Sequence, residues 1–228
     1  TAMSLSMLII SENTSETYYF KAINSVNIES EPTVGYTVRR DGVTPDFTLV
    51  PSVTQFTNED YTVSVDDLTV GISGIKSVTL NGTDVTDNFT PFTVSQNGKY
   101  TVEITAENGL SREKSIEIKN IDKIAPVITS VEVEHKNKGG FARLLSELSY
   151  GKFFNESIVL TASAEDEGVS GLASIEYRWY NASTDTYSDW AVYSDANKPV
   201  KDPNFKGFAE VRATDGAGNV SVVAVGEG

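Results

Sequence analysis

Short runs of alternating apolar and polar residues dominate the chain and predict β-strands. The runs at 61–65, 100–104 and 115–118 change character at every position. Successive side chains of a strand point to opposite faces, so a period of two puts one face on a core and the other in water. Residues 127–133 and 158–164 are also rich in strand-forming residues. We therefore expect an all-β fold.

Dipeptides that favour tight turns separate these runs. Asn81-Gly82, Asn97-Gly98 and Asn108-Gly109 each fall between two predicted strands. Asparagine and glycine tolerate the positive φ angles that two-residue hairpin loops require. Short strands joined by closely spaced turns are typical of a β-sandwich or a barrel.

The sequence also contains an internal duplication. Three blocks recur in the same order: residues 56–61 resemble 153–158, residues 73–78 resemble 170–175, and residues 102–109 resemble 209–216. One such match arises easily by chance, whereas three matches in one order indicate a repeated unit.

A third, partial copy begins the chain, and prolines suggest where the copies meet. Residues 18–25 resemble the third block, and Pro45 and Pro126 follow the ends of successive copies. Proline cannot donate to a sheet ladder, so it suits a linker or the start of an edge strand. We place boundaries near Asp41 and Asp122. The predicted domains are 1–40, the last strands of a truncated repeat; 41–121, a sandwich; and 122–228, a second sandwich.

The last domain carries an insertion at residues 134–152. Within it, Phe141, Leu144, Leu145 and Leu148 have the spacing i, i+3, i+4, i+7. This spacing forms one face of a helix, and Gly151 is a suitable C-terminal stop. We expect a short helix that caps one end of the last sandwich.

Composition narrows the classes of partner. The formal net charge is −14, from 32 acidic and 18 basic side chains. Nucleic acids and anionic lipids bind through lysine and arginine, so we expect neither as a partner. No apolar run approaches the roughly 20 residues that span a membrane, so we expect no membrane insertion.

The chain has no cysteine and a single histidine, His135. Thiol nucleophiles, thiolate metal sites and multi-histidine metal sites are therefore excluded within one chain. The absence of cysteine fits a cytosolic protein, or a Gram-positive surface protein that depends on its cores without disulfides.

Three motifs resemble bacterial immunoglobulin-like repeats. They are Asp-Lys-x-Ala-Pro at 122–126, Ser-Gly-Leu-x-Ser-Ile at 170–175, and Ala-Thr-Asp-Gly-Ala-Gly-Asn-Val-Ser at 213–221. Residues 18–24 also resemble the penultimate strand of a fibronectin type III-like repeat, whereas residues 107–110 depart from the pattern of the third motif. The resemblance implies tandem immunoglobulin-like sandwiches in a secreted or wall-anchored protein, mainly of Gram-positive bacteria.

Acidic pairs are the first candidates for chemistry. Asp66-Asp67 and Glu165-Asp166-Glu167 fall where a predicted strand meets the loop before a Ser-Gly pair. A glycosidase needs two carboxylates about 5–10 Å apart across a cleft, and neighbours in one exposed loop do not provide one. We expect no catalytic residues and no required cofactor. Calcium is the alternative to plain solvated acids, with Asp166 and Glu167 as candidate ligands, because calcium favours several oxygens from loops.

Aromatic residues gather in the last domain. Tyr177, Trp179, Tyr180, Tyr187 and Trp190 fall within one hairpin-like stretch. A sandwich commonly buries a tryptophan on a central strand, so we expect Trp179 and Trp190 to pack in the core. Tyr180 and Tyr187 are the candidates for an exposed platform that stacks on sugar rings.

We expect the chain to be a non-catalytic spacer in an extracellular, cell-surface or cell-wall-attached protein. Its partners are then the neighbouring domains of the same chain. One alternative is an adhesion or carbohydrate-binding module that contacts polysaccharide or a host-cell or other surface protein through Tyr180 and Tyr187. A second is an accessory region of a secreted glycoside hydrolase or protease.

Overall fold

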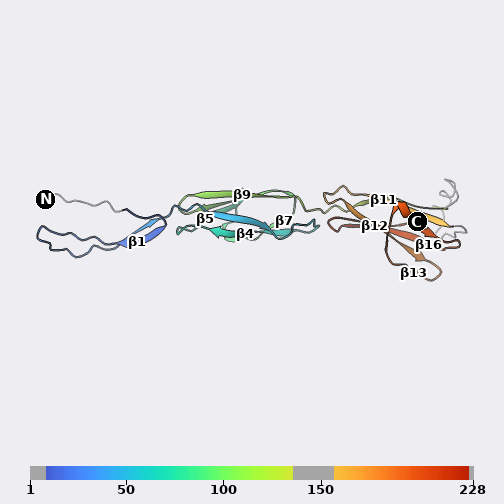
Figure 1. Cartoon of the computed structure of the whole chain (residues 1–228), viewed down its shortest axis with the longest axis horizontal. Helices are drawn as coiled ribbons and strands as arrows, with labels where there is room; N and C mark the ends of the chain where they lie inside the picture. The colour runs from blue at the N-terminus through green and yellow to red at the C-terminus, as the bar shows by residue number, and fades with distance from the viewer. Residues whose placement is uncertain (1–8, 136–156, 226–228) are drawn as a thin grey trace. The chain divides into compact units, whose positions relative to one another are not determined.

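The chain is described by a computed structural model that covers residues 9–135 and 157–225. In these ranges the only helices are two single 3-10 turns, η1 (Thr86–Asn88) and η2 (Asp195–Asn197). All the other elements are β-strands in small antiparallel sheets (Figure 1). The all-β expectation is confirmed at this level. The helix expected within 141–148 lies outside the described residues, and no described helix is long and apolar enough to cross a membrane.

The chain divides into two compact units. Unit 1 comprises residues 1–52, 61–94 and 98–118, and unit 2 comprises residues 53–60, 95–97 and 119–228. The two short loops of unit 2 therefore come from the part of the sequence that otherwise builds unit 1.

Unit 1 contains a hairpin and two further sheets. The hairpin pairs β1 (Thr14–Tyr18) with β2 (Tyr36–Arg40). The other sheets have the orders β3-β4-β7 and β6-β5-β8-β9. Their strands are β3 (Asp46–Pro51), β4 (Tyr61–Thr69), β5 (Ile75–Leu80), β6 (Thr83–Asp84), β7 (Phe92–Val94), β8 (Gly98–Ala106) and β9 (Ser111–Ile118).

The core of unit 1 follows the predicted alternation. Along β4, Tyr61, Val63 and Val65 are buried while the positions between them are partly exposed. Both sheets contribute buried side chains: Val63 and Val94 come from the first, and Val102 and Ile104 from the second. The tight turns between neighbouring strands help to fix which residues pair across the sheets.

The β5–β6 hairpin shows the expected turn chemistry. Its two-residue loop is Asn81-Gly82, with φ angles of 50° and 80°. Two consecutive positive φ angles match the right-handed twist of the flanking strands, and asparagine followed by glycine adopts them at low cost.

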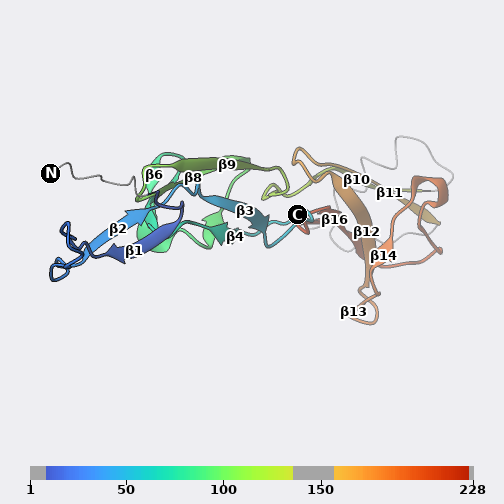
Figure 2. The ribbon, with the colours of Figure 1, turned by 60° about the vertical axis from the view of Figure 1, so that its left-hand side comes forward.

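Unit 2 contains a three-stranded and a five-stranded sheet. One sheet has the order β10-β11-β15, and the other has the order β13-β12-β16-β17 with β14 also paired to β12 (Figure 2). The strands are β10 (Val127–His135), β11 (Ile158–Glu165), β12 (Leu172–Asn181), β13 (Thr186–Tyr187), β14 (Ala191–Val192), β15 (Val200–Lys201), β16 (Gly207–Asp215) and β17 (Val220–Val225).

The core of unit 2 also draws on both sheets. Ile158 and Leu160 from β11 pack with Trp179 from β12 and with Ala209 and Val211 from β16. Buried and partly exposed positions alternate along the whole of β16, as a period of two requires. At one end of unit 2, β11 and β16 each end and are followed by a loop.

Candidate functional site

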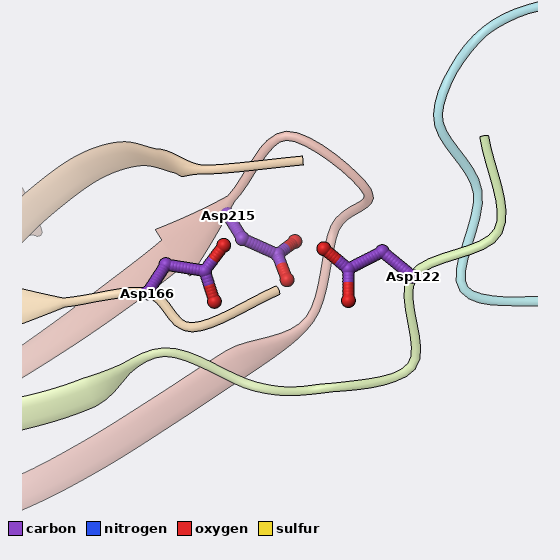
Figure 3. Close-up of side chains that lie close together, drawn as sticks. All are labelled: Asp122, Asp166 and Asp215. Atoms are coloured by element: carbon purple, nitrogen blue, oxygen red, sulfur yellow. The ribbon is translucent and has the colours of Figure 1, made fainter. Parts of the chain in front are cut away.

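Three aspartates lie close together where these loops begin (Figure 3). Asp122 lies just before β10, Asp166 directly follows β11, and Asp215 is the last residue of β16. One carboxylate oxygen from each residue lies within 4.8 Å of the other two. The carboxylates point toward one another, so three chain segments that are distant in sequence present negative charge to a single small space.

Two of these side chains are deeply buried. Asp122 and Asp215 are each only 3% exposed, and Asp166 is partly buried. Charged residues are rarely buried to this degree unless they are paired or coordinate a metal. Within 9–135 and 157–225, no lysine, arginine or histidine forms an ion pair with any of the three.

Backbone N–H groups fix the orientation of each carboxylate. Asp122 accepts from the N–H of Ile124 at 3.0 Å and from the N–H of Ser170 at 2.7 Å. Asp166 accepts from the N–H of Gly168 at 3.1 Å.

Asp215 is held by the turn that follows it. Its Oδ1 accepts from the N–H of Ala217 at 2.9 Å and from the N–H of Asn219 at 2.8 Å, while its Oδ2 accepts from the Asn219 side-chain amide at 2.7 Å. The Ala-Thr-Asp-Gly-Ala-Gly-Asn motif therefore folds into a loop that aims one carboxylate inward.

The hydrogen bonds determine the charge state of Asp122. Burial acts to raise the pKa of this carboxyl, but the Ser170 hydroxyl and the N–H groups of Ser170, Ile124 and Val169 outweigh it, so the pKa is lowered from its ordinary value. The residue is thus an anion near neutral pH. Carboxylates this close together repel unless hydrogen bonds or a positive charge offset the repulsion.

Two oxygen atoms at the cluster lack a hydrogen-bond partner. Oδ2 of Asp166 and Oγ of Ser170 are both buried and unpaired. The Ser170 hydroxyl lies close enough to Asp122 to help lower its pKa, but the two groups do not form a hydrogen bond of normal geometry. Buried polar atoms nearly always have a hydrogen-bond partner. One of these two atoms belongs to a carboxylate of the cluster and the other lies beside it, so both point to a ligand that accepts electron pairs.

Unit 1 contains the same framework with different side chains. Asp41 accepts from the N–H of Ser73 at 2.8 Å, as Asp122 accepts from Ser170. However, Thr69 stands four residues before Ser73, where Asp166 stands four residues before Ser170. Asn108 takes the place of Asp215 in the third repeated block. Unit 1 therefore retains one of the three carboxylates.

Sequence reasoning found one of the three residues. Asp166 was a predicted ligand and belongs to the cluster, whereas Glu167 is exposed and lies outside it. Asp122 and Asp215 were not among the predicted ligands, although both belong to the motifs that carried the family resemblance. Their motif positions were the available signal, because an aspartate that recurs at the end of a strand can serve a site as well as a turn.

The aromatic candidates lie elsewhere in unit 2. Tyr180 on β12 and Tyr187 on β13 are directly paired across the two strands, with ring centroids 5.0 Å apart. Phe208 stacks on Tyr180 at 4.7 Å, and the Tyr180 hydroxyl donates to Asp185 at 2.6 Å. Tyr187 is 44% exposed, whereas Tyr180 is partly buried.

The two tryptophans have different surroundings. Trp179 is 6% exposed and belongs to the core of unit 2, as the sequence predicted. Trp190 is only partly buried and lies near two guanidinium groups, with its ring centroid 4.6 Å from Cζ of Arg178 and 4.4 Å from Cζ of Arg212. Cation–π contacts of this kind stabilise a partly exposed ring. Arg178 also lies 4.0 Å from the ring centroid of Tyr187.

Compared with known proteins, the chain matches no family model, and none of the curated proteins is significantly similar to it in sequence.

Proposed function

We propose that the chain is a non-catalytic structural module of a secreted or cell-surface bacterial protein, in which residues 41–121 and 122–228 form immunoglobulin-like sandwiches that position neighbouring domains. Both units distribute their strands between two sheets in the same way. In residues 41–121, β3 and β4 join a three-stranded sheet while β5 and its hairpin partner β6 join the other; in residues 122–228, β10 and β11 join a three-stranded sheet while β12 and its hairpin partner β13 join the other. The immunoglobulin fold divides its strands in this manner.

The observation that carries the proposal is a pair of hydrogen bonds that recurs in both units. In each, an aspartate carboxylate accepts from a serine, and an asparagine amide donates to a backbone carbonyl at or near that aspartate. The Asp41 carboxylate binds Ser73, and the Asn108 amide donates to the backbone carbonyl of Val43 at 3.0 Å. In unit 2 the Asp122 carboxylate binds Ser170, and the Asn219 amide donates to the backbone carbonyl of Asp122 at 2.9 Å. The same pair of hydrogen bonds occurs around Asp41 and again around Asp122. This recurrence suits a series of repeats more than a single active centre.

A glycine makes room for each of these aspartates. A Cβ atom on Gly71 would lie 2.0 Å from Oδ1 of Asp41, and one on Gly168 would lie 2.2 Å from Oδ2 of Asp122. Both distances are far below a normal contact, so each carboxylate occupies space that another side chain would fill. In both units the position of the aspartate carboxylate therefore depends on a glycine beside it.

The segment that leads into the sheets of unit 2 is also held in place. The Asn97 side chain donates to the carbonyl of Ile121 at 2.8 Å and accepts from its N–H at 2.9 Å. The N–H of Asp122 donates to the carbonyl of Thr57 at 2.9 Å, and Lys123 forms an ion pair with Asp60. A spacer needs a segment of this kind, because a flexible linker transmits no geometry.

Hydrogen exchange tests this ordered segment. We expect the amides of Ile121 and Asp122 to exchange more than about tenfold more slowly than in a free peptide, because each N–H is hydrogen-bonded within unit 2. Asn97→Ala should accelerate exchange at Ile121, whereas Asn88→Ala, an exposed asparagine in η1, should not. Exchange at free-peptide rates in the unaltered protein would contradict an ordered spacer.

One observation keeps the carbohydrate-binding alternative in view: Tyr187 is substantially exposed beside Tyr180. The structural proposal predicts no measurable binding to a panel of soluble polysaccharides, measured by glycan array or affinity electrophoresis. Binding that is lost in both Tyr180→Ala and Tyr187→Ala, and kept in Tyr19→Ala, would establish the alternative. The accessory role in a secreted glycoside hydrolase or protease remains a proposal about the parent protein.

A further inference from the structure

The donor atoms of the aspartate cluster are all oxygens. Asp122, Asp166 and Asp215 each supply a carboxylate oxygen, and Ser170 Oγ is an unpaired hydroxyl beside them. Oxygen-only sites with several carboxylates suit hard cations, whereas zinc and copper sites normally include nitrogen or sulfur.

A bound cation accounts for the geometry of the cluster. One carboxylate oxygen from each aspartate lies within 4.8 Å of the other two, and Oδ2 of Asp166 is buried without a hydrogen-bond partner. A cation gives this oxygen a partner and offsets the repulsion between neighbouring carboxylates.

We propose that Asp122, Asp166 and Asp215 bind one Ca²⁺ ion in unit 2, with Ser170 Oγ as a further oxygen ligand. Calcium accepts six to eight oxygens in variable geometry, so water completes the shell beyond the protein ligands. Magnesium demands an octahedral shell and gives up its water reluctantly. Ligands fixed by loop hydrogen bonds and partly withdrawn from solvent therefore favour calcium.

The ligands come from both sheets of unit 2. Asp166 follows β11 in the three-stranded sheet, Asp215 ends β16 in the other, and Asp122 belongs to the segment before β10. An ion bound to all three therefore links the two sheets at one end of the unit. Because the unfolded chain does not assemble these ligands, binding stabilises the folded state by linkage.

Calorimetric titration of the whole chain, freed of metal with EDTA, tests the proposal. We expect one Ca²⁺ per chain with a Kd on the order of 10⁻⁴–10⁻³ M, the range of extracellular calcium modules. At about 10 mM Ca²⁺ the unfolding temperature of unit 2 should rise by about 2–8 °C. No heat of binding and no shift in unfolding temperature at this concentration would overturn the proposal.

The matched variants are Asp166→Asn and Glu167→Gln. Asp166→Asn removes a charge that no ion pair uses, so we expect the fold to persist, judged by circular dichroism, while calcium affinity falls at least tenfold. Glu167→Gln removes the neighbouring exposed charge and should retain the original affinity. Unchanged affinity in Asp166→Asn, or equal losses in both variants, would overturn the assignment.

A measurement on the unaltered protein guards against a variant that fails to fold. Backbone amide signals of residues 122–124, 166–170 and 215–219 should shift on addition of Ca²⁺ in nuclear magnetic resonance spectra. Shifts confined to other residues would place the ion elsewhere and overturn the proposal. A Mg²⁺ affinity equal to that for Ca²⁺ would overturn the choice of calcium.

Discussion

Replacing Trp179 by alanine is expected to lower the free energy of unfolding of unit 2 by about 3–5 kcal/mol. The indole is 6% exposed and packs edge-on against Phe205 and Tyr177, with ring centroids 5.5 Å and 6.2 Å away. It joins β12 to the buried residues of β11 and β16. Truncation leaves a cavity that β-strands fixed by ladder hydrogen bonds cannot easily close. Urea unfolding followed by circular dichroism measures the loss.

Trp190→Ala is the matched control for this experiment. Trp190 is partly buried and contacts Arg178 and Arg212 rather than the apolar core. Its loss removes two cation–π contacts, each worth roughly 0.5–2 kcal/mol. A larger effect at Trp190 than at Trp179 would mean that Trp179 does not anchor the core of unit 2.

Replacing Ile104 by alanine is expected to destabilise unit 1 by about 2–5 kcal/mol and to leave unit 2 unchanged. Ile104 is fully buried on β8, among residues of unit 1 alone. The two units have separate cores, so their unfolding should be separable. Calorimetry should show the transition of unit 1 moving to lower temperature.

The tryptophans give this prediction a clean readout. Both of them, Trp179 and Trp190, lie in unit 2, so tryptophan fluorescence reports only that unit. Ile104→Ala should therefore shift part of the circular dichroism transition without moving the fluorescence transition. Leu160→Ala, fully buried in unit 2, should produce the reverse pattern. A fluorescence shift in Ile104→Ala would show that the units unfold as one.

Strand positions were predictable because their signal is local. Along β4 and β8, alternation marked which side chains would be buried, and the buried residues Val63 and Ile104 follow it. The Asn81-Gly82 loop was predictable for the same reason, since its φ angles depend on two adjacent residues. The sandwich arrangement itself stays a proposal, supported by the matching sheet orders of the two units.

The environment of the aromatic residues was only partly predictable. The core position of Trp179 was expected because a sandwich commonly buries a tryptophan on a central strand, and Ile175 and Tyr177 on the same strand also pack against this core. Trp190 differs, because its surroundings depend on Arg212, which β16 contributes from another part of the sequence. A period along one strand carries no information about the side chains on its neighbour.

The sequence by itself determined the class of fold, the duplication and one of the three clustered acids, because alternation, repeated blocks and acidic loops are properties of contiguous residues. Only the tertiary structure decided that Asp122, Asp166 and Asp215 share one small space, with their carboxylate oxygens within 4.8 Å. Asp166 follows a strand of one sheet, Asp215 ends a strand of the other, and Asp122 precedes β10, so the packing of the two sheets brings the three together. In unit 1 Asp41 likewise accepts from Ser73, and the Asn108 amide donates to the carbonyl of Val43, but Thr69 and Asn108 stand at the positions of Asp166 and Asp215, so the framework recurs while two of the three carboxylates do not.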